Sequence, residues 1–304
     1  MTADHTAGSN LRVAVIGAGT MGAGIAQISA SAGHDVAVFD TDPAQVERAL
    51  AATTASLDKF VAKEKVTREA ADAALARLSP AATIAEAATG ADFVIEAVLE
   101  QLPVKHEVFR AALETAPEHC ILGTNTSQLS ITAIGSGVGD AAGRVVGMHF
   151  FNPPVLMRLV ELVRGLQTTD DTLERAEAFA QGLGKETVVC RKDSPGFLTS
   201  RISAIVRLEC LRMLEEEVAS PADIDKALKL GLNFPMGPLE LGDFNGLDTY
   251  LHALQGLEVS FGERFKPTTT LKNLVAAGRL GRKTGQGIYR YGEDGKRIEG
   301  EDGW

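Results

Sequence analysis

Residues 11–40 read LRVAVIGAGTMGAGIAQISASAGHDVAVFD and alternate between two structural patterns. An apolar run at 11–16 is followed by a glycine-rich turn, by residues 23–32 with apolar side chains at helical spacing, and by a second apolar run. A strand, a glycine turn, a helix and a second strand in this order are typical of the first unit of a parallel, nucleotide-binding sheet.

The glycine turn has the spacing GxGxxG and comprises Gly17, Ala18, Gly19, Thr20, Met21 and Gly22. In a dinucleotide site the first glycine makes the tight turn, the second admits a pyrophosphate close to the backbone, and the third lets the helix pack on the strand. Asp40 closes the second strand 18 residues after Gly22. A carboxylate there binds a ribose 2'-hydroxyl and repels a 2'-phosphate, which predicts NAD as the cofactor. The alternative is a glycine-rich turn with a surface aspartate.

Short apolar runs alternate with longer alanine-rich segments up to about residue 194, which predicts an α/β domain with a doubly wound, Rossmann-type sheet. The expected strands cover residues 11–16, 35–39, 92–97, 120–123, 144–149, 157–163 and 186–190. Residues 43–80, between the second and third strands, are rich in Ala, Glu and Lys. This segment is too long for one crossover helix, so we expect an inserted helical pair that projects from the sheet.

A second, all-α domain is expected over residues 195–304, beside a nucleotide-binding domain over 11–194 and a disordered polar tail over 1–10. The segment DSPG at 193–196 is a helix-start signal. Helical spacing of apolar residues then predicts helices over 197–218, 221–230, 238–261 and 269–277. No Gly/Ser-rich or Pro-rich linker precedes residue 195, so we expect no flexible tether between the domains.

Composition excludes several classes of protein. A net charge of −10 and a pI near 5.2 argue against a nucleic-acid partner, because phosphate contacts need clustered Lys and Arg. Cys120, Cys190 and Cys210 are far apart and lack metal-ligand spacing, so we expect neither a disulfide framework nor a metal site. No stretch approaches the roughly 20 apolar residues of a membrane span, and no signal peptide is recognised at the N-terminus. We expect a cytoplasmic protein without a membrane partner.

Residues 147–163, GMHFFNPPVLMRLVELV, place one histidine and one glutamate in apolar surroundings. His149 ends one apolar run, Pro153 and Pro154 change the direction of the chain, and Glu161 interrupts a second run. If the chain folds back near residue 155, the two side chains face each other. A carboxylate fixes the tautomer of an imidazole and favours its protonated form, which is how a general acid/base histidine is built. The alternative is a buried polar pair without chemistry.

Seven segments occur in the order found in the L-3-hydroxyacyl-CoA dehydrogenase family: GAGTMGAGIA, FVIEAVLEQLPVK, NTSQLSIT, GMHFFNPPVLMRLVELV, KDSPGF, NFPMGPLEL and GRKTGQGIY. The chain resembles the short, single-function members of this family from about residue 11 to 292, including enzymes of the 3-hydroxybutyryl-CoA dehydrogenase type. The resemblance implies NAD-dependent oxidation of a (3S)-3-hydroxyacyl-CoA to the 3-oxoacyl-CoA, or the reverse reduction, in fatty acid metabolism.

The resemblance also assigns roles to individual residues. His149 and Glu161 match the catalytic pair, with His149 as general base or acid and Glu161 orienting it. Ser127 and Asn152 match polar residues around the reacting carbon and the nicotinamide, although Ser127 can equally cap a helix starting near Ile131 and Asn152 can simply make a turn.

Further matches concern the cofactor and coenzyme A. Glu100, Lys105 and Lys283 match cofactor contacts, a solvated basic turn being the alternative for Lys283. Ser56 and Lys63 match coenzyme A contacts, with Lys59 and Lys65 adding positive charge; a solvated helix face is the alternative.

One departure concerns Ser200, where the family commonly has Asn before Arg201. The Asn is expected to help hold the substrate near its carbonyl, and serine is shorter and lacks the two amide N–H donors. The substitution does not affect the expected type of reaction, but it leaves the preferred acyl group undetermined.

Three interpretations of the function remain open. The first is the NAD-dependent oxidation of a 3-hydroxyacyl-CoA that the resemblance implies. The second is the same chemistry on a carrier-bound, dicarboxylyl or free hydroxy acid, and the third, of another class, is a non-catalytic NAD-binding protein. By the family resemblance we also expect a homodimer through the C-terminal helices, for which the apolar face of 197–218 is suitable; the same face can instead belong only to that domain's core.

Overall fold

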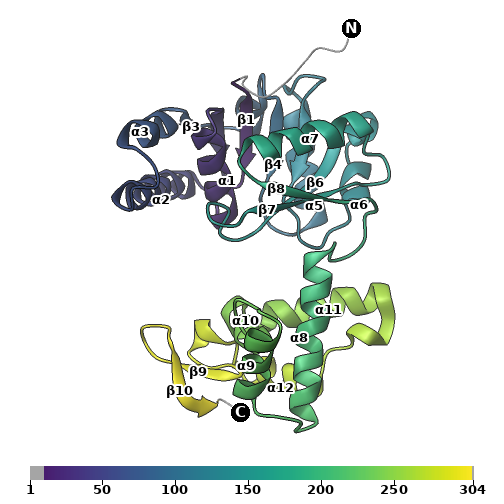
Figure 1. Ribbon diagram of the computed structural model, residues 1–304. Helices are drawn as coiled ribbons and strands as arrows, with labels where there is room; N and C mark the ends of the chain where they lie inside the picture. The colour runs from purple at the N-terminus through teal and green to yellow at the C-terminus, as the bar shows by residue number, and fades with distance from the viewer. Residues whose placement is uncertain (1–9, 303–304) are drawn as a thin grey trace. The chain divides into compact units, whose positions relative to one another are not determined.

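The computed structural model describes residues 10–302 and divides into two compact units between Ser194 and Pro195. Unit 1 contains an eight-stranded sheet in the order β3-β2-β1-β4-β5-β6-β7-β8 (Figure 1). Its strands are β1 (Arg12–Ile16), β2 (Asp35–Phe39), β3 (Leu78–Pro80), β4 (Phe93–Glu96), β5 (Ile121–Thr124), β6 (Val145–Phe150), β7 (Leu159–Val163) and β8 (Glu186–Cys190). All pairings are parallel except β6 with β7. The expected Rossmann-type sheet is confirmed, with the β6–β7 pairing as its departure from a purely parallel arrangement. The tail expected over residues 1–10 lies, except for Asn10, outside the described residues.

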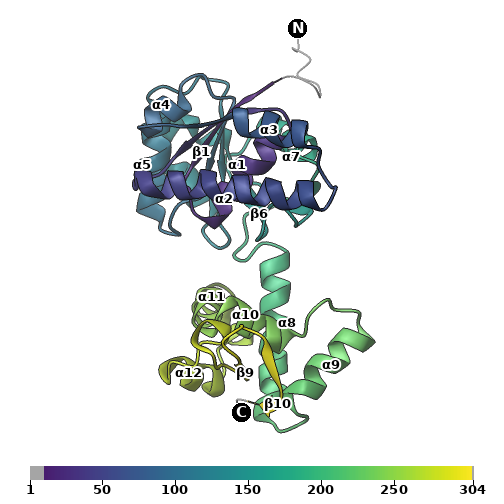
Figure 2. The ribbon, with the colours of Figure 1, turned by 90° about the vertical axis from the view of Figure 1, so that its left-hand side faces the viewer.

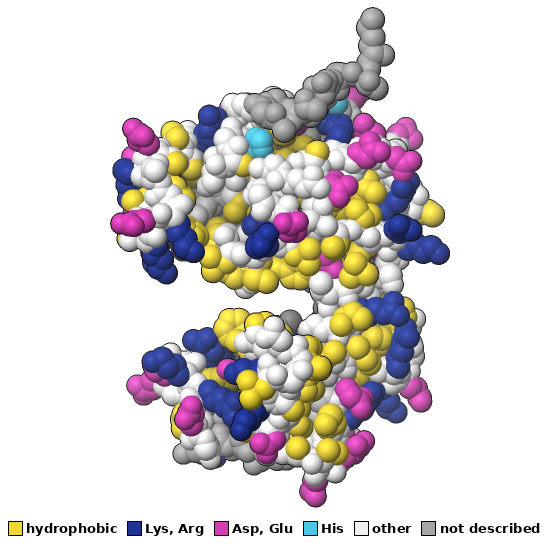
Figure 3. Space-filling view, in the orientation of Figure 1, with side chains coloured by type: hydrophobic (Ala, Val, Ile, Leu, Met, Phe, Trp, Pro, Cys, Tyr) yellow, Lys and Arg dark blue, Asp and Glu magenta, His cyan; other side chains and the backbone are white. Residues whose placement is uncertain are grey.

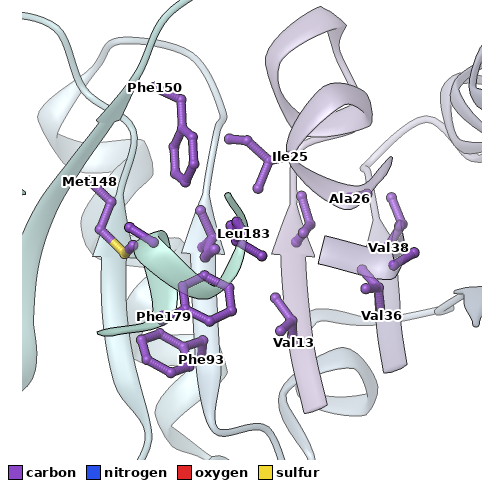
Figure 4. Packing of buried hydrophobic residues seen from close by; sticks show 14 of the residues in the cluster. Val13, Ile25, Ala26, Val36, Val38, Phe93, Met148, Phe150, Phe179 and Leu183 are labelled. Atoms are coloured by element: carbon purple, nitrogen blue, oxygen red, sulfur yellow. The ribbon is translucent and has the colours of Figure 1, made fainter. Parts of the chain in front are cut away.

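Helices cover both faces of this sheet, as Figure 2 shows for α4 and α5 on one side and α7 on the other. The helices of unit 1 are α1 (Thr20–Ser31), α2 (Pro43–Ala62), α3 (Arg68–Ala76), α4 (Ile84–Ala88), α5 (Leu102–Leu113), α6 (Ile131–Ser136) and α7 (Asp170–Gly182), with a 3-10 turn η1 (Gly139–Arg144). Figure 4 shows the core between α1, α7 and the sheet, where the Phe93 and Phe179 rings stack 4.2 Å apart. Both faces are buried because parallel strands leave neither face to solvent.

The segment 43–80 departs from the expected purely helical insertion. It begins with α2 and α3, whose apolar residues Val46, Leu57 and Ala71 join the core around α1. Residues 78–80 then form β3, which pairs with β2 at the edge of the sheet. The prediction of a wholly helical segment was wrong at its end because β3 has three residues, ends in a proline and carries no apolar run.

Unit 2 is mostly helical and comprises α8 (Thr199–Glu215), α9 (Pro221–Gly231), α10 (Pro238–Asn245), α11 (Leu247–Phe261) and α12 (Thr269–Ala276), with 3-10 turns η2 (Gly262–Phe265) and η3 (Arg282–Thr284). The all-α expectation needs correction, because β9 (Tyr289–Tyr291) and β10 (Arg297–Asp302) form an antiparallel pair. These strands lack an alternating apolar pattern. The helix expected over 238–261 is interrupted at Gly246, whose φ of +97° breaks the helical path.

None of the helices formed by residues 10–302 has the length and apolar character that spanning a bilayer would require.

Candidate active site

The three glycines of the turn after β1 differ in what a side chain at each position would contact. Gly17 has φ +101°, and a Cβ there would lie 2.6 Å from the Ala97 carbonyl oxygen. A Cβ on Gly22 would lie 1.7 Å from the Gly17 carbonyl oxygen, so α1 packs directly on the turn. A Cβ on Gly19 would meet nothing within 4 Å. Gly19 therefore borders open space at the N-terminus of α1, where backbone N–H groups favour an anion.

Asp40 lies at the carboxyl end of β2 and is half-buried. Its Oδ2 accepts a hydrogen bond from the Ala18 backbone N–H at 2.8 Å, and its Oδ1 accepts one from the Asp42 N–H at 3.0 Å. Thr20 and Met21 form the first turn of α1. The carboxylate thus lies beside the glycine turn, and this arrangement fits a dinucleotide with a free ribose 2'-hydroxyl.

His149 and Glu161 face each other across the one antiparallel pairing of the large sheet. The register pairs His149 on β6 with Glu161 on β7, and His149 Nδ1 lies 2.7 Å from Glu161 Oε2. His149 is 7% exposed and Glu161 is fully buried. The Phe151 ring packs on the imidazole with a centroid distance of 4.6 Å. A buried carboxylate bound to Nδ1 leaves Nε2 as the ring nitrogen for proton transfer.

A buried ion pair that the sequence analysis missed lies at the carboxyl end of β4. Lys105 Nζ lies 2.7 and 2.9 Å from the two carboxylate oxygens of Glu96. Both side chains are almost fully buried, and Thr124 Oγ1 donates to Glu96 at 2.7 Å. The sequence did contain a signal for Glu96: it is an acidic residue at the carboxyl end of an apolar strand. Asp40 occupies the corresponding position directly after β2.

Glu100 connects this ion pair to the loop after β5. Lys105 Nζ also lies 3.1 Å from Glu100 Oε2. Glu100 Oε1 accepts hydrogen bonds from Thr126 Oγ1 at 2.5 Å and from the Ser127 and Gln128 backbone N–H groups at 3.0 and 3.1 Å. Burial raises the pKa of Glu100, but the Lys105 charge and these hydrogen bonds outweigh it, so that the pKa lies below its ordinary value. Glu100 therefore holds the backbone at Ser127 as an ionised carboxylate.

Ser127 and Asn152 occupy loops at the carboxyl ends of β5 and β6. The helix-capping alternative for Ser127 is wrong, because Ser130 caps α6 by accepting from the Ala133 N–H at 3.1 Å. Asn152 is exposed and precedes a cis peptide bond to Pro153. The turn that follows is closed by the Pro153 carbonyl oxygen, which accepts from the Leu156 and Met157 N–H groups.

The residues matched to coenzyme A contacts lie on α2. Ser56 is half-buried, and Lys63 is exposed at the C-cap of the helix. Ser56, Lys59 and Lys63 are spaced by three and four residues, so they share one face of α2. This face brings two ammonium groups and a hydroxyl together in an acidic chain.

Two predicted site residues belong to unit 2. Ser200 lies in the first turn of α8 and is half-buried. Lys283 lies in η3, where its ammonium is 2.6 and 2.7 Å from the carboxylate oxygens of Asp248. The Lys283 hydrogen bond lowers the pKa of Asp248. Lys283 is therefore ion-paired rather than simply solvated.

Within residues 10–302, no group of three or more His, Cys, Asp or Glu side chains is arranged to hold a metal ion.

A glycine turn suited to a dinucleotide and a buried histidine–glutamate pair define a nucleotide-dependent oxidoreductase. Residues 12–194 match the model described as "3-hydroxyacyl-CoA dehydrogenase, NAD binding domain", and residues 196–291 match "3-hydroxyacyl-CoA dehydrogenase, C-terminal domain". The chain belongs to the 3-hydroxyacyl-CoA dehydrogenase family. The predicted family, cofactor and NAD-dependent 3-hydroxyacyl-CoA dehydrogenase activity are confirmed.

Several named proteins are similar over most of the chain. A probable 3-hydroxybutyryl-CoA dehydrogenase from Bacillus subtilis is 41% identical over 93% of this chain and 98% of its own length. The 3-hydroxyadipyl-CoA dehydrogenase of Escherichia coli is 41% identical over 95% of this chain, which spans 60% of that longer protein. The crystal structure of (S)-3-hydroxybutyryl-CoA dehydrogenase PaaH1 from Ralstonia eutropha has a TM-score of 0.89 at 41% identity and covers 93% of this chain and 100% of its own.

Proposed function

We propose that His149 is the general base for oxidation of the 3-hydroxyl group of a (3S)-3-hydroxyacyl-CoA, and the general acid in the reverse reduction. The observation that carries this proposal is the 2.7 Å contact between His149 Nδ1 and the buried Glu161 carboxylate. Bound NAD supplies the hydride acceptor. His149 Nε2 takes the hydroxyl proton, and the Glu161 carboxylate stabilises the imidazolium that results.

The cofactor would be held mainly by residues in the loops that follow the carboxyl ends of the strands. The open backbone at Gly19 and the N-terminus of α1 suit the pyrophosphate, and Asp40 suits the ribose 2'-hydroxyl. We assign the cofactor contacts to Gly17, Gly19, Thr20, Met21, Gly22, Asp40, Glu100, Lys105, Ser127, Asn152 and Lys283. Within this set, Glu100 and Lys105 act partly by fixing the backbone at Ser127.

We assign substrate contacts to Ser56, Lys63, Ser127 and Ser200. The face of α2 that carries Ser56, Lys59 and Lys63 offers local positive charge for the coenzyme A phosphates. Replacing Lys63 with Ala should raise KM for acetoacetyl-CoA and leave KM for NADH unchanged. An unchanged KM for acetoacetyl-CoA would instead favour a carrier-bound or free acid as substrate.

The catalytic role is tested by His149→Gln, a variant that keeps a polar side chain and cannot exchange a proton near neutral pH. We expect kcat to fall about 10²- to 10⁴-fold, with the NADH dissociation constant within about twofold of wild type. His106→Gln is a matched control, because His106 bonds the Ala133 carbonyl oxygen away from the β6–β7 pair. Equal kcat values for the two variants would refute the assignment of His149 as the general base.

We further propose a domain division at residues 194/195, a homodimer through the C-terminal helices, and a cytoplasmic location. The exposed apolar residues Leu198, Ile202 and Val218 near α8 support the dimer, which light scattering at micromolar concentration tests directly. Cys120 and Cys210 are buried and form no disulfide bond within residues 10–302, which supports a reducing compartment.

A further inference from the structure

The loop after β5 is joined to the end of β6 by one side chain. Asn125 is the first residue after β5, and its Oδ1 accepts a hydrogen bond from the Phe150 backbone N–H at 2.9 Å. Phe150 is the last residue of β6 and directly follows His149. The bond therefore attaches the strand end that carries the proposed general base to a residue outside the β6–β7 pair.

This contact replaces a strand partner that β6 lacks on one side. The parallel pairing of β5 with β6 ends at Thr124 and Gly147, whereas β6 continues beside β7 as far as Phe150. Phe150 is 2% exposed, and a buried backbone N–H without an acceptor costs about 1–3 kcal/mol. The Asn125 side chain supplies that acceptor where β5 no longer runs beside β6.

Asn125 is itself fixed by β4 and by the residues on either side of it. Its backbone N–H donates to the Glu96 carbonyl oxygen at 2.8 Å. Thr124, before it, donates from Oγ1 to the Glu96 carboxylate at 2.7 Å. Thr126, after it, donates from Oγ1 to Glu100 at 2.5 Å. An acceptor whose backbone is held in this way can define the position of the strand end that it binds.

We propose that Asn125 is a positioning residue that fixes the His149 imidazole relative to Ser127. This inference rests on the proposed function, in which His149 is the base and Ser127 contacts the substrate. Ser127 lies two residues after Asn125 on the same loop. Phe151, which packs on the imidazole at a centroid distance of 4.6 Å, belongs to the chain just past the Asn125 bond. Loss of that bond frees this strand end, and a displacement of about 1 Å at a reacting group can cost about 10²-fold in rate.

Two variants remove the acceptor with opposite effects on side-chain volume, Asn125→Ala and Asn125→Leu. With NAD and (3S)-3-hydroxybutyryl-CoA, we expect kcat to fall about 10- to 100-fold in both. KM for the acyl-CoA and the NADH dissociation constant should stay within about threefold of wild type, because Glu100 still holds the Ser127 backbone.

Asn125→Asp keeps an oxygen acceptor in the same place and is the rescue variant. Its kcat should return to within about threefold of wild type. Acidic and basic side chains are interspersed over the face of unit 1 that Figure 3 shows, so one added negative charge does not reverse the field of a one-signed surface.

Thr168→Val is the matched control, because Thr168 Oγ1 donates to the Val145 carbonyl oxygen at 2.6 Å, at the other end of β6. It should lower the melting temperature, since it leaves a buried carbonyl oxygen without its donor, and keep kcat within about threefold of wild type. An equal loss of kcat in this control would overturn the proposal and assign Asn125 to the stability of β6. Loss of folding in both acceptor-free variants would lead to the same assignment.

Two further results would overturn the proposal: wild-type kcat in the acceptor-free variants, or a loss of kcat that Asn125→Asp does not restore. His149→Gln separates this inference from the proposed function. Wild-type kcat in His149→Gln refutes the proposed function, whereas an impaired His149→Gln beside fully active Asn125→Ala and Asn125→Leu refutes only the role of Asn125.

Discussion

Replacing Glu161 with Gln isolates the contribution of the buried carboxylate to catalysis. The amide has almost the same shape and can still accept a hydrogen bond from His149 Nδ1, now 2.7 Å from the carboxylate oxygen. What the variant loses is the negative charge beside an imidazole that gains a proton during oxidation. Neither partner is screened by solvent, since Glu161 is fully buried and His149 is 7% exposed.

The size of the loss follows from the distance and the burial. Two unit charges about 4 Å apart attract by about 4 kcal/mol at an effective dielectric constant near 20. A charge-assisted hydrogen bond is about twice as strong as a neutral one, so the retained bond recovers part of this energy. A net loss of about 2–4 kcal/mol lowers kcat about 30- to 1,000-fold.

The assay follows the formation of NADH from NAD and (3S)-3-hydroxybutyryl-CoA, the direction in which His149 gains the proton, and NADH binding is measured separately by fluorescence. The NADH dissociation constant should stay within about twofold of wild type, because the nucleotide turn lies on β1 and α1. Glu186→Gln on β8 is the control, since Glu186 is 72% exposed and, among the described residues, pairs only with the exposed Arg158. A kcat within about threefold of wild type for Glu161→Gln, or an equal loss of NADH binding, would refute the reasoning.

Three further predictions concern the glycine turn, the buried ion pair and an aspartate in unit 2. Gly19→Ala should leave the melting temperature unchanged and weaken NADH binding. Gly22→Ala should instead unfold the turn, because its Cβ would lie 1.7 Å from a carbonyl oxygen. Calorimetry and NADH titration distinguish the two variants, and a lowered melting temperature for Gly19→Ala would contradict this account. Lys105→Met should lower the free energy of unfolding by about 3–5 kcal/mol, since it leaves Glu96 buried without its cation. Urea unfolding measures this loss, and a value below about 1 kcal/mol would argue against a stabilising role for the ion pair. Burial raises the pKa of Asp243 from 3.8 to about 6, so the folded state retains this proton to higher pH than the unfolded state. The stability of wild type relative to Asp243→Asn should therefore fall by about 2–3 kcal/mol as the pH rises from about 4 to 7, and a constant difference in urea unfolding would disprove it.

The sequence predicted the parts of the fold that local patterns encode. Apolar runs marked seven of the eight strands of the large sheet, and the prolines at 153–154 marked the reversal that brings His149 opposite Glu161. The period of two in a strand then places both side chains on one face. These features are predictable because each depends on a short stretch of chain.

Features that depend on distant residues escaped the sequence analysis. β3 has no apolar run of its own and is a strand only because the edge of β2 offers unpaired backbone groups. Glu96 and Lys105 are nine residues apart on a strand and a helix, and no spacing rule indicates that they meet.

The β6–β7 hairpin also affects how easily this enzyme can be remodelled. β7 is held on both sides, by β6 in antiparallel and by β8 in parallel register, so its alignment does not depend on the connecting loop alone. The tip of that loop carries Leu156 and Met157, which are 63% and 42% exposed. Insertions grafted between these two residues should leave the acid–base pair in place. The loop tip is therefore a suitable position for building new substrate contacts by directed evolution.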